Sequence, residues 1–143
     1  MKYDLIFYLS KKTSYCEKAL KKALSPIGAE VYQITSATTP VMLGDQVSRS
    51  LKTCPLTVII GGFNSFDDDN LRTVLSRVFS NSPLTLENMR RLSAESGGEG
   101  YIIRDRGQIL LALPDDPAAI TQMCGEKLTA YISEKLDGKK EEE

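Results

Sequence analysis

Several residue types are absent or scarce in these 143 residues, and each absence excludes a class of function. There is no histidine, which excludes Ser-His-Asp and Cys-His catalytic groups, histidine metal ligands and a histidine pH switch. There is no tryptophan, and the six tyrosines and four phenylalanines are scattered, which disfavours an aromatic platform for nucleic-acid bases. Eighteen basic and nineteen acidic residues give a net charge of −1, so no basic excess is available for a nucleic-acid backbone. Chemistry must therefore come from carboxylates, hydroxyls, backbone amides, lysines, arginines or thiols.

Long apolar runs are also missing. The longest, at 57–60 and 109–114, are far shorter than the roughly 18 residues that a membrane-spanning helix needs. The first residues include Asp4 and lead into no extended apolar core, which is not the pattern of a secretory signal. We therefore expect a cytoplasmic protein that does not associate with membranes.

The cysteines do not form a recognisable pair. Cys16, Cys54 and Cys124 are an odd, widely spaced set without a C-x-x-C motif, so reduced, buried thiols are expected rather than disulfides, a zinc site or nucleophiles. No internal repeat or flexible linker divides the chain. We expect one domain over 1–136 and a polar, disordered tail over 137–143.

Strand-like and helix-like patterns alternate along the sequence. The run at 56–60 is apolar without alternation, as in a strand buried on both faces of a parallel sheet. The order predicts a three-layer α/β/α sandwich with a mostly parallel central sheet and a β-hairpin. The expected strands cover 2–9, 29–34, 56–60, 101–104 and 108–113; the expected helices cover 14–24, 41–51, 71–79, a short segment at 86–92, and 117–132.

Helix starts have recognisable local signals. Ser14 and Glu17 have the spacing of a capping box for the first helix. We expect Asp116 to be the N-cap of the last helix and Pro117 to be its first helical residue. Gly107 suits the left-handed position of a three-residue hairpin loop.

The loop after the central strand is the strongest candidate for a ligand site. Gly61 and Gly62 close the strand, and Asp67, Asp68 and Asp69 precede the next helix. Ligands of open α/β sheets bind at the carboxyl ends of the strands. The glycines can equally mark a strand exit where no side chain fits, and the acids can simply favour a helix N-terminus. Three consecutive acids are more than a cap needs, so Mg²⁺ binding is the functional alternative.

Two further loops have the same ambiguity. Gly97, Gly98 and Gly100 can form a flexible loop or bring backbone amides close to an anion. Pro114 and Asp115 precede the last helix without being needed for its cap. The arginine pairs at 90–91 and at 104 and 106 are typical of solvated faces. Phosphate contact is the minority interpretation.

Together the three loops resemble the molybdopterin-binding domain family, which includes molybdenum-cofactor biosynthesis adenylyltransferases and the N-terminal domain of competence/damage-inducible protein A. The resemblance is carried by residues 58–69, 96–100 and 109–117. It implies a cytoplasmic homo-oligomer, dimer or trimer, that binds a small-molecule pterin (molybdopterin) or an adenine nucleotide, with Asp69 and Asp68 as catalytic residues and Mg²⁺ ligands. The implied ligand-binding residues are Gly61, Gly62, Phe63, Asn64, Ser65, Ser96, Gly97, Gly98, Pro114 and Asp115.

Three departures from the family pattern bear on activity. Phe63, Asn64 and Ser65 stand where the family has a glycine-containing loop close to phosphate. Asp115 replaces the glycine of Pro-Gly-x-Pro, which puts a carboxylate where backbone amides should face a ligand anion. No aspartate occurs within 34–39, where the family has its other acid. We therefore expect weakened or lost adenylyltransferase activity.

Two other functions remain open at this point. A non-catalytic assembly or regulatory protein could reuse the fold, and in that case replacement of Asp69 would leave function intact. A flavodoxin-like mononucleotide binder is a further alternative, which bound flavin would reveal.

Overall fold

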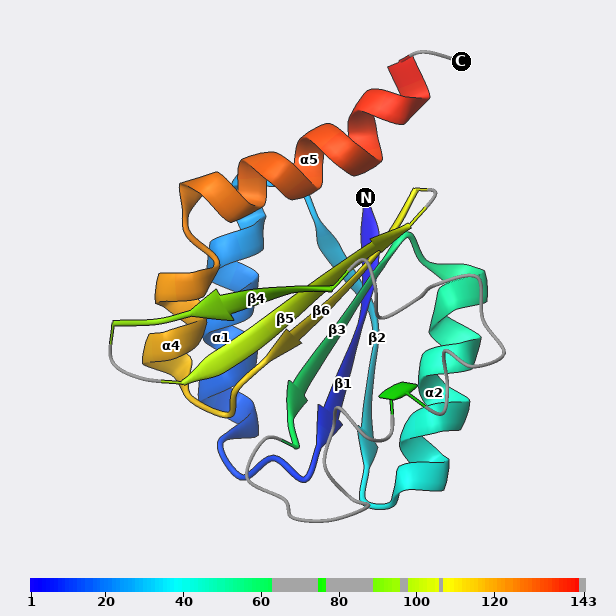
Figure 1. Ribbon diagram of the computed structural model, residues 1–143, viewed down its shortest axis with the longest axis vertical. Coiled ribbons are helices and arrows are strands. Elements are labelled where there is room, and N and C mark those ends of the chain that lie inside the picture. The colour runs from blue at the N-terminus through cyan, green and yellow to red at the C-terminus, as the bar shows by residue number, and fades with distance from the viewer. Residues whose placement is uncertain (63–74, 77–88, 96–97, 106, 142–143) are drawn as a thin grey trace.

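The computed structural model describes residues 1–62, 75–76, 89–95, 98–105 and 107–141. The described part is built on one six-stranded sheet with the order β2-β1-β3-β6-β5-β4 (Figure 1). Strands β1, β2, β3 and β6 are parallel, whereas β5 and β4 are antiparallel to their neighbours. The strand bounds are β1 Lys2–Tyr8, β2 Glu30–Ala37, β3 Leu56–Gly61, β4 Met89–Ser93, β5 Glu99–Asp105 and β6 Gln108–Leu113.

Helices cover both faces of this sheet. On one face lie α1 (Thr13–Leu24), the short 3-10 helix η1 (Ser25–Ile27), α4 (Pro117–Met123) and α5 (Glu126–Glu141); on the other lies α2 (Pro40–Thr53) (Figure 1). The arrangement confirms the expected three-layer α/β/α sandwich with a mostly parallel sheet and a hairpin.

Successive side chains of the strands point to opposite faces of the sheet and pack in two separate hydrophobic cores. Leu5, Phe7, Val58 and Leu111 pack on the side of α1, α4 and α5. Ile6, Tyr8, Ile59 and Leu110 pack on the side of α2, together with Leu75. Strand β3 is buried at all six positions because both of its faces are covered, as its unalternating apolar sequence predicts. Of the expected helix at 71–79, the described residues are 75 and 76, which are helical.

The segment around Met89 differs from its prediction. Instead of a short helix, Met89–Ser93 forms β4 and pairs antiparallel with β5. The i, i+3 spacing of Met89 and Leu92 suited a helix, but pairing along the free edge of β5 satisfies the backbone of this segment. Leu92 pairs with Gly100 and still packs against the core on the α1 side.

The last predicted helix is interrupted. Helix α4 ends at Met123 and α5 begins at Glu126, with Cys124 in a non-helical conformation between them. Gly125 accepts the first hydrogen bond of α5 from the amide of Thr129 at 3.1 Å. The break turns the chain (Figure 1), so that residues on both sides of it remain in the core on the α1 side.

Candidate ligand site at the carboxyl edge of the sheet

Strand register brings two of the predicted loops, those after β3 and β6, to one edge of the sheet together with the segment that follows β1. Tyr8 of β1 is level with Gly61 of β3, and Ile60 of β3 is level with Leu113 of β6. The chain segments that follow these three parallel strands therefore start side by side. This edge is where ligands bind in open α/β sheets.

Gly61 is required by the close approach of two strands. Its φ is +106°, and a Cβ built on it would lie 2.2 Å from the backbone oxygen of Tyr8. Any larger residue would collide with β1. The close approach of the two strands therefore explains this glycine without a role in ligand binding. Gly62 also has a positive φ of 85°, a backbone conformation that glycine adopts without a steric penalty.

Gly98 belongs to the same edge. Its φ is +102°, and a Cβ built there would lie 3.6 Å from Cγ of Pro114 and 3.8 Å from Cβ of Ala119. Gly98, directly before β5, thus packs beside the loop that follows β6. The structure consequently brings together five of the predicted ligand-binding residues: Gly61, Gly62, Gly98, Pro114 and Asp115.

Asp115 is held by the segment between β1 and α1. Its Oδ1 accepts hydrogen bonds from Oγ of Ser10 at 2.7 Å, the amide of Lys12 at 3.2 Å and the thiol of Cys16 at 3.5 Å. Its Oδ2 accepts from the amides of Lys11 at 2.7 Å and Lys12 at 3.4 Å. One carboxylate therefore accepts from two backbone amides and a hydroxyl just ahead of α1 and from the thiol of Cys16 within α1. Negative charge is favourable at this helix terminus.

This contact corrects the prediction for the start of α1. The helix begins at Thr13, its N-cap Lys12 makes no side-chain cap hydrogen bond, and Ser14 lies inside the first turn. The expected capping box of Ser14 and Glu17 is therefore wrong: Glu17 instead pairs with Lys21 at 2.8 Å. The anion at this helix terminus comes from Asp115, about a hundred residues along the chain, which a local pattern cannot reveal.

The surroundings of Asp115 perturb two titratable groups. Partial burial raises the pKa of Asp115, but the hydrogen bonds from Lys11, Ser10, Lys12 and Cys16 outweigh it and hold the pKa below its usual value. Burial, followed by the hydrogen bond and negative charge of Asp115, raises the pKa of Cys16 to about 12. The Cys16 thiol therefore stays protonated near neutral pH and donates to the carboxylate rather than acting as a nucleophile.

Sequence reasoning missed the polar segment after the first strand. Ser10, Lys11 and Lys12 begin two residues after the end of β1, and their position after a parallel strand was the available signal. By contrast, the prediction for α4 is confirmed: Asp116 is the N-cap, its Oδ1 accepts from the amide of Ala118 at 3.1 Å, and Pro117 is in the first turn.

The remaining predicted site residues lie outside the described residues: Phe63, Asn64, Ser65, Asp68, Asp69, Ser96 and Gly97. The predicted Mg²⁺ ligands are among them. Within the described ranges, no group of three or more Cys, Asp or Glu residues is arranged to hold a metal ion.

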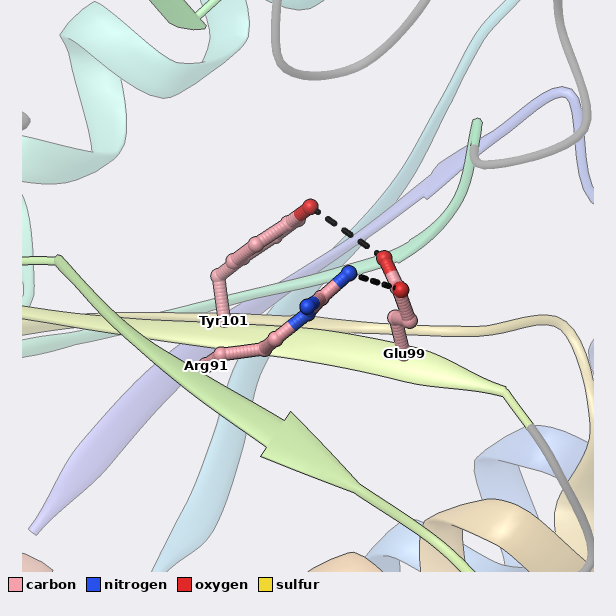
Figure 2. Close-up of polar contacts among 3 residues, drawn as sticks. All are labelled: Arg91, Glu99 and Tyr101. Carbon is pink, nitrogen blue, oxygen red and sulfur yellow. Dashed lines mark hydrogen bonds and ion pairs between the residues drawn. The ribbon is translucent and has the colours of Figure 1, made fainter.

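Arg91 lies on an exposed face of the hairpin, as expected for a solvated arginine. Its guanidinium forms an ion pair with Glu99 across β4 and β5, and the hydroxyl of Tyr101 donates to the other oxygen of Glu99 at 3.5 Å (Figure 2). The side chain of Arg91 is 66% exposed. This surface cluster is explained by cross-strand pairing alone.

The cysteines have the environment that the sequence predicts. All three cysteines are free and buried, and burial raises the pKa of Cys124 to about 12. Among the helices in the described part of the chain, none is long and apolar enough to cross a membrane.

This sheet order and these edge loops define an α/β domain with the fold of molybdopterin biosynthesis and CinA proteins. No protein-family model matches the sequence, and no curated protein matches it. A molybdopterin biosynthesis protein from Mycobacterium abscessus superimposes with a TM-score of 0.68 at 12% identity, covering 98% of this chain and 96% of that one. The protein CinA from Thermoplasma acidophilum gives 0.65 at 15% identity, with 95% and 99% covered.

A third solved structure agrees with these two. The tungsten cofactor synthesizing protein MoaB from Pyrococcus furiosus gives a TM-score of 0.61 at 16% identity, with 96% of this chain and 95% of that chain covered. The resemblance seen in the sequence is therefore confirmed at the level of the fold, and the low identities make this chain a divergent example of it.

Proposed function

We propose that this chain binds a pterin or an adenine nucleotide through its phosphate at the carboxyl edge of the sheet, with weakened or lost adenylyltransferase activity. The observation that carries the proposal is the meeting of the Gly61–Gly62, Gly98 and Pro114–Asp115 loops at this edge, on a fold shared with molybdopterin biosynthesis proteins.

The contacts of Asp115 support the loss of anion affinity. The amides of Lys11 and Lys12 and the hydroxyl of Ser10 are the kind of donors that hold phosphate at a helix N-terminus. In this chain they donate to an internal carboxylate. A ligand phosphate that used these donors would have to displace Asp115 and would meet its negative charge.

Asp68 and Asp69 are the proposed catalytic residues and Mg²⁺ ligands if transfer activity is retained. Their carboxylates are the oxygen donors that Mg²⁺ prefers, and the metal would neutralise charge on a transferring phosphate. A homo-oligomer of two or three copies in the cytoplasm belongs to the same proposal.

Calorimetric titration tests ligand binding. The full chain is titrated with molybdopterin, ATP and ADP-ribose, each with Mg²⁺, and thermal shifts are measured in parallel. We expect heat and stabilisation with at least one of them. Neither heat nor a thermal shift with any ligand would overturn the proposal.

A matched pair of variants tests the role of Asp115. Asp115→Gly frees the donors near α1, and Asp45→Gly removes the same charge from an exposed position on α2. Because each hydrogen bond to a charged group contributes about 1.5–3 kcal/mol, we expect Asp115→Gly to bind the anionic ligand at least ~10-fold more tightly than wild type. Equal affinities of Asp115→Gly and Asp45→Gly would contradict the blocking role.

The internal carboxylate also favours a second function, a non-catalytic assembly or regulatory protein that reuses the fold. On this alternative Asp69→Ala leaves the measurable function intact, whereas changes that disrupt the oligomer abolish it. Light scattering of wild type and Asp69→Ala, alongside the titrations, distinguishes the two proposals: ligand heat that disappears in Asp69→Ala supports the first.

A further inference from the structure

Asp4 is a buried carboxylate with one oxygen, Oδ1, that has no hydrogen-bond partner among the described residues. It lies on β1 beneath α2 and is 7% exposed. Among the described residues, its Oδ2 accepts a long hydrogen bond of 3.5 Å from the hydroxyl of Thr53, and that hydroxyl also lies 3.2 Å from the carbonyl oxygen of Arg49. The thiol of Cys54 also interacts with this carboxylate. No hydrogen-bond donor among the described residues reaches Oδ1. An unsatisfied buried carboxylate oxygen is costly and rare in folded proteins.

A buried pair of hydroxyl groups nearby has a proton to donate and lacks an acceptor for it among the described residues. Oγ of Ser50 on α2 and Oγ1 of Thr57 on β3 lie 2.5 Å apart, and either can be the donor. Ser50 is 2% exposed and Thr57 is fully buried. One of their two protons is used within the pair, and the other has no acceptor in the described part of the chain. This pair therefore needs an acceptor, just as Asp4 needs a donor.

A small pocket connects the two groups. It is bounded by Asp4 and Ser50 together with Gln33, Gln46 and Arg49, and its volume is about 20 Å³. One water molecule needs at least ~10–15 Å³ of such space and two to four polar neighbours. The pocket therefore has the size and the polar lining that a single water molecule needs.

We propose that this pocket binds one structural water molecule, which donates a hydrogen bond to Oδ1 of Asp4 and accepts one from Oγ of Ser50. Thr57 then donates to Ser50, so every proton of the hydroxyl pair has an acceptor. A bare cation satisfies Asp4 but cannot accept the Ser50 proton, and it is opposed by the positive charge of Arg49 at the same pocket. The water links β1 to α2 on the face opposite α1.

A crystal structure of the full chain tests the occupant directly, with one crystal soaked in rubidium chloride. We expect a solvent peak within hydrogen-bonding distance of both Oδ1 of Asp4 and Oγ of Ser50, without anomalous scattering from rubidium. A rubidium signal at this position would show a cation site. That result, the absence of any peak, or a direct Arg49–Asp4 ion pair filling the pocket would each overturn the proposal.

A double-mutant cycle tests the bridge in solution. Asp4→Asn and Ser50→Ala, alone and combined, are compared by urea unfolding, with Ser48→Ala at an exposed position of α2 as the matched control. Groups that share a partner are coupled, so we expect the effects of the two single changes on the unfolding equilibrium constant to be non-additive by at least ~2-fold. Additive effects, or equal coupling of Asp4→Asn to Ser48→Ala, would contradict the bridge.

Discussion

Replacing Asp115 with alanine is the sharpest test of how this fold is held together at its candidate site. The change removes the acceptor for Ser10, Lys11, Lys12 and Cys16 at once. The two amide donors are exposed, so water can replace the carboxylate there; the hydroxyl and thiol contacts are partly buried. A desolvated hydrogen bond to a charged group contributes about 1.5–3 kcal/mol, and an anion near a helix N-terminus adds about 0.3–1 kcal/mol.

Allowing for solvation of the amides, we expect Asp115→Ala to lower the free energy of unfolding by about 2 kcal/mol. For a domain of this size that corresponds to a fall in Tm of about 6–8 °C. Urea and thermal unfolding at pH 7 measure both quantities. Asp45→Ala, which removes an exposed aspartate from α2, is the control and should change stability by less than ~0.5 kcal/mol.

The pH dependence of this difference has a defined sign. Folding lowers the pKa of Asp115, so its contribution is fully present above the unfolded value of about 3.9 and is lost as the pH falls through the lower folded pKa. The stability gap between wild type and Asp115→Ala should therefore be constant near neutrality and shrink below about pH 4. Equal stabilities at pH 7, or a gap that widens on acidification, would refute this account of the site.

Three further outcomes follow from single contacts. Gly61→Ala should lower the free energy of unfolding by more than ~3 kcal/mol, because its Cβ would lie 2.2 Å from the backbone oxygen of Tyr8. Gly28 has a φ of +70° and open space around it, so Gly28→Ala should lower the same quantity by about 1 kcal/mol. Equal losses for the two variants in urea unfolding would contradict the steric role of Gly61. Thr39→Ala removes the side-chain N-cap of α2 and should cost about 1 kcal/mol, while unchanged stability would show that this cap is not needed. Cys124, with its pKa raised to about 12, should react with a thiol reagent at neutral pH only as fast as the protein unfolds; rapid labelling of the native chain would contradict its burial.

Local and periodic features of the sequence were sufficient for much of the fold. The apolar run at 56–60 predicted a strand buried on both faces, and β3 has that environment. Asp116 and Pro117 predicted the start of α4 because both signals act within one helical turn. Met89–Ser93 was predicted wrongly because its spacing suits a helix, while its partner β5 decides that it forms a strand.

For the candidate site too, the sequence predicted some features and the tertiary structure decided the others. The sequence by itself determined the glycine-rich loops, the acid at position 115 and the α/β order that brings strand ends to one edge, because these depend on residue type and local periodicity. Only the tertiary structure decided what Asp115 does. Parallel pairing of β1, β3 and β6 places its carboxylate against the amides before α1, across a separation of 104 residues. No local pattern encodes such a contact, since it exists only when distant strands are in register.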